Sequence, residues 1–149
     1  VSGNANFMVN TQLEGDELEV KANDNSLVQF KKPIQVSALK LEVAGSANMV
    51  AEELAVEKLN CVMNGSGSIR LKAGKANQGD FSTASSGDIH ALGVAIPDIK
   101  CKMVGNGLTE VHPTDHLDAS LVGKGTIRYK GPATVEQRSI GKGSIEEIK

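Results

Sequence analysis

Three charged residues recur at a constant interval in the C-terminal half of the sequence. Lys100, Asp118 and Glu136 lie 18 residues apart from one another in succession. Carbohydrate-active enzymes use carboxylates on one face beside a basic group, and a glycosidase needs two carboxyls at a set distance across a cleft. The spacing marks Lys100, Asp118 and Glu136 as candidate binding residues, and it assigns no catalytic residue.

The histidines give little support for a metal site. His112 and His116 flank a Pro-Thr-Asp segment, and His90 lies about a repeat earlier. Zinc sites draw their ligands from tighter and more regular spacings than this. We therefore expect the three histidines to be solvent-exposed polar residues near a corner, with no bound metal and no cofactor.

A short turn-like motif repeats along the chain and supplies the framework for these residues. It starts at residues 45, 65, 85, 105, 123 and 141, and weaker copies start at 3 and 24. The successive steps of 18 to 21 residues make seven periods, which is the signature of a repeat architecture. Glycine suits a sharp bend because it tolerates positive φ. The glycines that we assign to these turns are Gly45, Gly65, Gly67, Gly87, Gly105, Gly107, Gly123, Gly125, Gly141 and Gly143.

Apolar residues alternate with polar ones on both sides of each turn, a pattern that is typical of half-buried strands. Leu39, Leu41 and Val43 precede one turn, and Met49 and Ala51 follow it. The same positions of the other repeats are mostly apolar as well. Strands repeated at this interval predict an all-β, single-stranded β-helix (β-solenoid) of about seven coils. An antiparallel sandwich is the competing architecture, but it requires hairpin turns every 8–12 residues.

The two cysteines test this register. Cys61 and Cys101 lie two repeats apart, with Phe81 at the same position between them. Two rungs of a β-solenoid separate them by about 9.6 Å, whereas a disulfide needs Cα atoms within about 7 Å. We expect two buried free thiols that act as small hydrophobic side chains. A disulfide, which is ordinary in exported proteins, is the alternative.

Outward-facing charges form columns in the same register. Glu110, Arg128 and Glu146 occupy one column, and Asp80 and Lys100 lie in another with Asp118. Opposite charges on neighbouring strands stabilise a sheet mildly, so we expect these columns to act as charge ladders.

Composition narrows the function. The formal net charge is −2, which does not favour nucleic acid as a partner. No apolar run approaches the roughly 20 residues of a transmembrane segment. Aromatic residues make up only 3% of the chain, as a narrow tube with little room for rings would require. We expect one domain over residues 1–149, with less regular coils over 1–44 and regular Gly-x-Gly coils over 45–149.

The motifs over residues 65–148 resemble the bacterial head-GIN domain family of auto-transporter adhesins. The phrase that carries the resemblance is Leu-Asp-Ala-Ser-Leu-Val-Gly-Lys-Gly-Thr-Ile-Arg-Tyr-Lys-Gly, residues 117–131. Thr109 departs from the pattern, because a polar residue occupies a usually aliphatic position. The resemblance implies a right-handed β-helix and a location in the cell envelope or outside the cell. The sequence starts at Val1, so we expect that an export signal has been removed.

These features predict a non-catalytic adhesion or binding module whose partner is a glycan or an extracellular or surface protein. One alternative is a carbohydrate-active β-helix enzyme, a polysaccharide lyase or hydrolase. Another is a structural module that forms homo-oligomers through exposed ends or edges, because unpaired strands at solenoid ends favour pairing with another chain.

Overall fold

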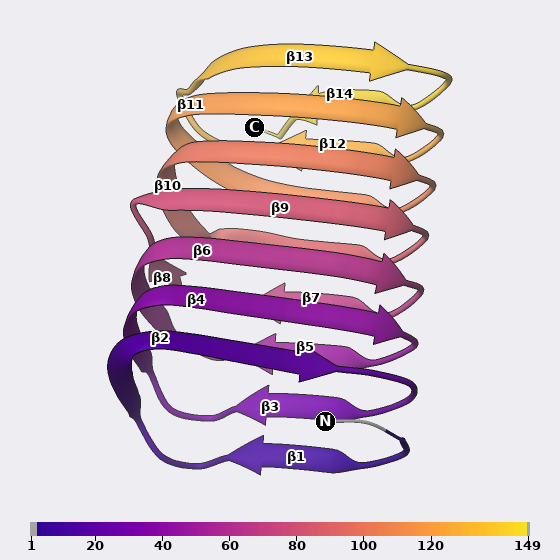
Figure 1. Ribbon diagram of the computed structural model, residues 1–149. Helices are drawn as coiled ribbons and strands as arrows, with labels where there is room; N and C mark the ends of the chain where they lie inside the picture. The colour runs from indigo at the N-terminus through magenta and orange to yellow at the C-terminus, as the bar shows by residue number, and fades with distance from the viewer. Residues whose placement is uncertain (1–2, 149) are drawn as a thin grey trace.

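The computed structural model describes residues 3–148, except for the side chain of Ser85. Val1, Ser2 and Lys149 lie outside the described residues. The regular elements of the described chain are all β-strands, and they pair in parallel. Figure 1 shows them stacked as the coils of a right-handed solenoid of about seven turns. The expected all-β solenoid is confirmed.

The strands follow the repeat along the chain. They are β1 (Asn6–Val9), β2 (Leu13–Ala22), β3 (Leu27–Phe30), β4 (Ile34–Gly45), β5 (Asn48–Ala51), β6 (Leu54–Gly65), β7 (Ser68–Leu71), β8 (Gly74–Lys75), β9 (Gln78–Ser85), β10 (Asp88–Gly105), β11 (Leu108–Gly123), β12 (Thr126–Tyr129), β13 (Thr134–Ile140) and β14 (Ser144–Glu147).

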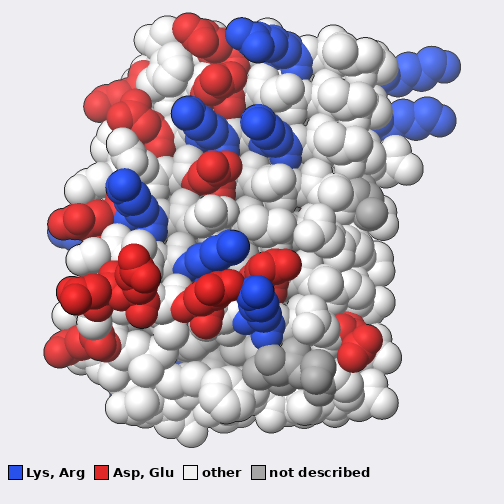
Figure 2. All heavy atoms as spheres, in the orientation of Figure 1, with Lys and Arg blue, Asp and Glu red and all other residues white. Residues whose placement is uncertain are grey.

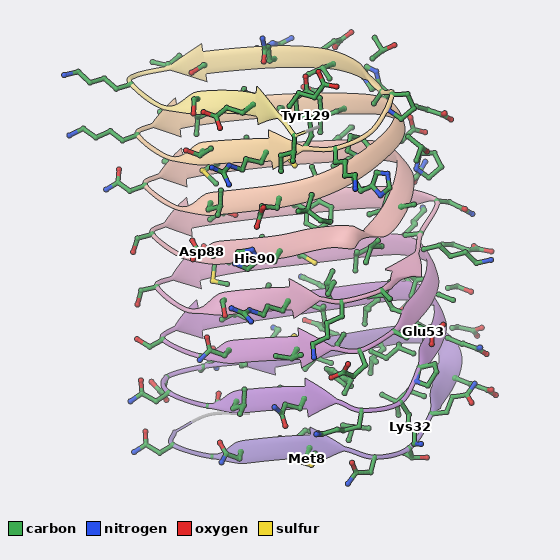
Figure 3. All side chains as sticks on the ribbon, turned by 180° about the vertical axis from the view of Figure 1, so that it is seen from behind. Met8, Lys32, Glu53, Asp88, His90 and Tyr129 are labelled. Carbon is green, nitrogen blue, oxygen red and sulfur yellow. The ribbon has the colours of Figure 1, made fainter. Side chains whose placement is uncertain are left out.

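Each coil has a long face and a return face, joined by the glycine corner. The long face consists of β2, β4, β6, β9, the second parts of β10 and β11, and β13, and it lies in front in Figure 1. The return face consists of β1, β3, β5, β7, the first parts of β10 and β11, β12 and β14. A short third side completes the coil. Figure 3 shows the rod from behind, with Asp88 and His90 on the return face and Lys32 and Glu53 at the bend beyond it.

The pairing register is that of the sequence repeat. Leu39 pairs with Leu59, Leu59 with Gly79, and Gly79 with Ile99. The same column continues through Leu117 to Val135. Each step of the repeat therefore moves a residue one rung along the rod and keeps its side chain on the same face.

The core is a thin tube of stacked side chains. Inward residues of both faces are buried, among them Leu41, Met49, Met63 and Ile89. Phe81 is fully buried and is the largest of these core side chains. A column of aliphatic side chains shares its apolar surface with the rung above and below, so each coil depends on its neighbours for burial.

The corners stack main chain against main chain. The amide of Ser66 donates to the carbonyl of Gly45 at 2.8 Å, and Ser46 donates to Asp24 at the same distance. Gly65 has φ of 136°, and a Cβ atom placed there would lie 2.2 Å from the carbonyl oxygen of Gly45. Asp24 occupies the corresponding corner of an earlier coil with φ of 62°, because Asp tolerates this conformation better than most residues.

We expect Gly65→Ala to destabilise the protein by at least about 2 kcal/mol, because a methyl group adds both backbone strain and a main-chain clash. The free energy of unfolding in urea measures the effect. Gly15→Ala is the matched control: the added methyl group meets nothing within 4 Å, so its effect should stay within about 1 kcal/mol. Equal losses in the two variants would contradict the stacked corner.

Two threonines interrupt the apolar core and satisfy each other. Thr83 lies between Met63 and Met103 on the long face, and Thr109 faces it from the return face. Both are about 2% exposed, and their hydroxyl oxygens lie 3.2 Å apart. The polar residue at Thr109 is therefore matched by a second buried polar residue, Thr83, on the opposite face.

A double-mutant cycle tests this pair. Thr83→Val or Thr109→Val alone should cost about 1–3 kcal/mol, because each leaves a buried hydroxyl without its partner. The double variant should recover most of that loss, since two apolar groups of the same shape then pack together. Urea unfolding of the four proteins gives the coupling energy, and simple additivity of the two losses would contradict the hydrogen bond.

Candidate functional site

The structure brings the three charged candidates into one column on the long face. Lys100 pairs with Asp118, and Asp118 pairs with Glu136. Asp80 precedes Lys100 on the adjacent rung. Their side chains point outward because they alternate with buried inward residues. The repeat spacing therefore places these residues as neighbours along the rod.

A trough with a volume of about 450 Å³ lies on this face, between two columns of outward side chains. Its floor is the outer side of the main chain at Leu59, Gly79 and Ile99. These three positions are register partners in a column that faces the core. The trough runs along the rod axis across the rungs of β6, β9, β10 and β11. The polar residues that line it are Lys58, Gln78, Asp98 and His116 on one side and Asn60, Asp80 and Lys100 on the other.

Only one of the three candidate binding residues from the sequence lines the trough. Lys100 lines it, but Asp118 and Glu136 do not, because they lie one and two rungs farther along the same column. The residues of the other wall were not identified from the sequence. Lys58, Gln78, Asp98 and His116 are Cα partners in succession, and their steps of 20, 20 and 18 residues were the available signal.

The lining groups are suited to hydrogen bonding of a polar ligand. Asn60 and Gln78 supply amides, Asp80 and Asp98 supply carboxylates, and Lys100 supplies an ammonium group. The residues that line the trough include no Phe, Tyr or Trp. Recognition there would depend on polar contacts and on the aliphatic stems of the long side chains. Figure 2 shows positive and negative side chains interspersed over this part of the long face.

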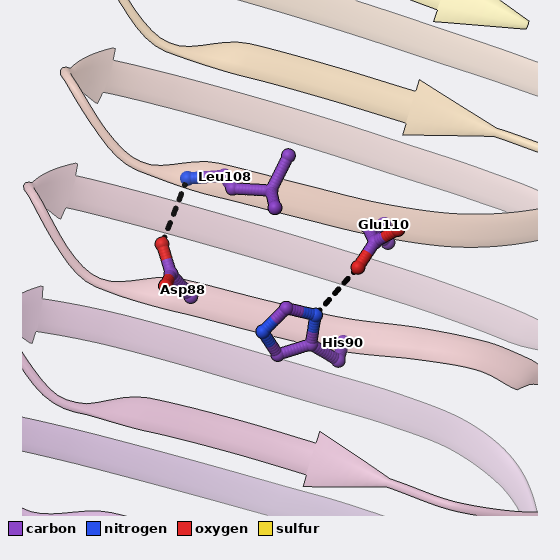
Figure 4. Close-up of polar contacts among 4 residues, drawn as sticks. All are labelled: Asp88, His90, Leu108 and Glu110. Atoms are coloured by element: carbon purple, nitrogen blue, oxygen red, sulfur yellow. Dashed lines mark hydrogen bonds and ion pairs between the residues drawn. The ribbon is translucent and has the colours of Figure 1, made fainter.

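Charges on the return face follow the expected ladder in part, because Arg128 pairs with Glu146 but Glu110 pairs with His90. His90 Nδ1 and Glu110 Oε1 lie 2.5 Å apart, and Arg128 Nε lies 3.6 Å from Glu146 Oε2. Asp88 accepts a hydrogen bond from the amide of Leu108 at 3.2 Å, one rung along (Figure 4). Glu110 is thus held by His90 of the preceding rung, although its register partner on the other side is Arg128.

The histidines lie apart and are half-buried, in place of the exposed positions expected. His90 lies on the return face, His112 on the third side, and His116 in the wall of the trough. A second hollow of about 310 Å³ lies beside His90, with Arg70 and Lys72 in its lining. Lys72 is paired with Glu52 at 3.1 Å, and His90 with Glu110, so two of its three basic groups already have acidic partners.

Both cysteines are buried in the core as free thiols. Cys61 pairs in register with Phe81, and Phe81 with Cys101, so the aromatic ring's rung separates the two sulfur atoms. Burial raises the pKa of both thiols well above the usual range, and nearby Asp80 acts in the same direction. The thiols therefore stay neutral and serve as apolar packing.

The structure thus defines a parallel β-solenoid with a ligand-sized trough on its outer face. A sequence model of the family described as "Putative auto-transporter adhesin, head GIN domain" matches residues 1–133. The chain belongs to this family. Within residues 3–148 there is no helix of the length and apolarity that crossing a membrane requires.

Solved structures show the same fold. A protein of Parabacteroides distasonis described as a putative adhesin shares 60% identity, with a TM-score of 0.98. A putative adhesin of Parabacteroides merdae shares 55% identity, also with a TM-score of 0.98. A second P. distasonis protein, described as a putative lipid binding protein, shares 28% identity with a TM-score of 0.95.

The matches cover 99% of this chain in each case, but 62%, 62% and 60% of the other chains. This chain therefore spans about three-fifths of the length of these solved chains. None of the curated proteins matches the sequence significantly.

Proposed function

We propose that this chain is a binding module of the bacterial cell surface or exterior, and that it holds a glycan in the trough of the long face without turning it over. The observation that carries the proposal is the trough itself, with its two walls of amide, carboxylate and amino groups. Membership of an adhesin family supports a surface location and a role in attachment.

The shape of the trough favours a chain of sugars over a folded protein. A stable protein–protein contact buries about 800 Å² on each partner, usually over a flat area. A concave site with a few convergent polar groups is typical of small or narrow ligands. The rungs are about 4.8 Å apart, and polar groups repeat with that spacing along both walls. A sugar polymer can therefore offer a hydroxyl or carboxylate to each rung in turn.

An array of bacterial and host oligosaccharides, incubated with labelled protein, tests the proposal. We expect retention of at least one class of glycan, with no shortened product in the supernatant by mass spectrometry. The strongest glycan of the array then serves as the titrant in calorimetry. Asp80→Ala or Lys100→Ala should weaken its binding at least about tenfold, because each removes a charged hydrogen-bonding group.

Two matched variants control for the loss of charge. Asp118→Ala and Lys40→Ala remove the same groups from the same column outside the trough, and we expect glycan affinity to change less than about twofold. Equal weakening by Asp118→Ala would place the ligand elsewhere on the column. Cleavage of the glycan, or retention on none of the arrayed glycans, would contradict the proposal.

A further inference from the structure

Three large aliphatic side chains form a continuous exposed stripe next to the corner of the long face. Val104, Val122 and Ile140 are Cα partners in succession and are 55%, 40% and 71% exposed. Each directly precedes a corner glycine and points outward, while its inward neighbours fill the core. Single exposed aliphatic residues are ordinary, but a contiguous group of them indicates an interaction surface. We call Val104, Val122 and Ile140 the apolar stripe.

Basic residues border the apolar stripe on both sides. Lys102 and Arg138 lie two residues before it on the long face, and Lys124 and Lys142 lie at the corner just after it. All four side chains are exposed, and none of them has an acidic partner within the described residues. These three rungs thus combine three aliphatic and four cationic groups. Of the three outward positions nearest the corner on each rung, the two others, Asn106 and Ser120, are uncharged, and the charged column of Lys100, Asp118 and Glu136 follows at the next outward position.

This combination is confined to the last three rungs of the long face. In the preceding rungs, the position of the apolar stripe holds Ala44, Asn64 and Ala84. The corner positions there hold Ser46, Ser66 and Ser86. Figure 2 shows the same contrast: the right-hand band of the face carries few charges, and basic side chains project from its upper edge. The chain as a whole has a net charge of −2, so the local excess of four positive charges is not a general property of its surface.

We infer that this surface binds anionic phospholipid bilayers, with the apolar stripe entering the boundary between headgroups and acyl chains. The four cations are placed to contact lipid phosphates on either side of it. Surface-bound amphipathic segments combine an apolar face with flanking Lys and Arg in the same way. Each Lys or Arg near an anionic membrane surface raises the binding constant about fivefold.

Charge complementarity favours a bilayer over a second copy of the chain. A two-fold contact through the stripe would bring four cations against four cations, which is unfavourable. A soluble polyanion would pair with the cations and leave the apolar stripe in water. Asp118 and Glu136 begin one outward position beyond Ser120 and Arg138, so the membrane-facing area ends there and the trough remains accessible.

Co-sedimentation with unilamellar vesicles tests the inference. The purified chain is mixed with vesicles of equal parts phosphatidylglycerol and phosphatidylcholine, and separately with phosphatidylcholine alone, at 50 mM and 500 mM NaCl. We expect binding to the anionic vesicles at low salt, weaker binding at high salt because the charges are screened, and little binding to phosphatidylcholine. No binding to anionic vesicles, or equal binding to both compositions, would overturn the inference.

Three variants assign the effect to this surface. Lys124→Gln/Lys142→Gln should lower the binding constant about 30-fold, from about fivefold per charge. Val104→Thr/Val122→Thr/Ile140→Thr keeps β-branched side chains on the strands and should weaken binding at least about tenfold at constant charge. Lys31→Gln/Lys32→Gln removes two exposed cations elsewhere and should have less than about a twofold effect. Circular dichroism verifies that each variant is folded.

An equal loss in Lys31→Gln/Lys32→Gln would show general electrostatic attraction and would overturn the inference. A second result would also overturn the inference: the protein does not bind the vesicles, light scattering shows that it is a dimer, and the threonine variant is a monomer. The glycan titration uses other residues, and it can fail or succeed independently of this test.

Discussion

Main-chain hydrogen bonding between successive coils fixes the register on which every other feature of this protein depends. At the corner, the amide of one coil donates to the carbonyl of the previous one, as Ser66 does to Gly45. Glycine is needed there because the main chains approach too closely for a side chain, as at Gly65. With the register fixed, the length of each repeat alone decides which residues lie side by side. Core columns and surface columns are two consequences of the same pairing.

Much of this arrangement could be predicted from the sequence because the signal is periodic. Steps of 18 to 21 residues and period-2 alternation were enough to place Cys61, Phe81 and Cys101 on one column and Lys100, Asp118 and Glu136 on another. Both columns are present in the structure. The spacing of the repeats does not determine how far a side chain extends from the strand, or whether two columns of side chains form a groove between them. The trough depends on a second wall and on the strand surface at Gly79, and neither feature is visible in the spacing of one column. Asp118 was therefore chosen as a candidate binding residue from its spacing, although it lies outside the trough.

Two remaining differences concern which neighbour a polar side chain contacts. Thr109 was a polar exception on its own column, and its partner Thr83 lies across the tube. Glu110 was expected to pair with Arg128 along the column but is held by His90 on its other side. The repeat within one face cannot predict the contact between Thr83 and Thr109. His90 and Glu110, in contrast, are register partners on one face, and side-chain reach decides whether Glu110 pairs with His90 or with Arg128. The two proposed ligands likewise use different parts of one face: the trough offers mixed charges, and the apolar stripe offers aliphatic groups bordered by cations alone.

Disulfide trapping of neighbouring rungs measures the register directly. Asn48 and Ser68 are Cα partners on the return face, and their side chains share a hydrogen bond of 2.9 Å. Adjacent rungs lie about 4.8 Å apart, within the Cα separation that a disulfide spans. Asn48→Cys/Ser68→Cys should therefore oxidise to an intramolecular disulfide in the folded protein, with the native thiols buried and unreacted. Asn48→Cys/Asp88→Cys, two rungs apart, should remain reduced. A disulfide in the second variant and none in the first would contradict the stacked register.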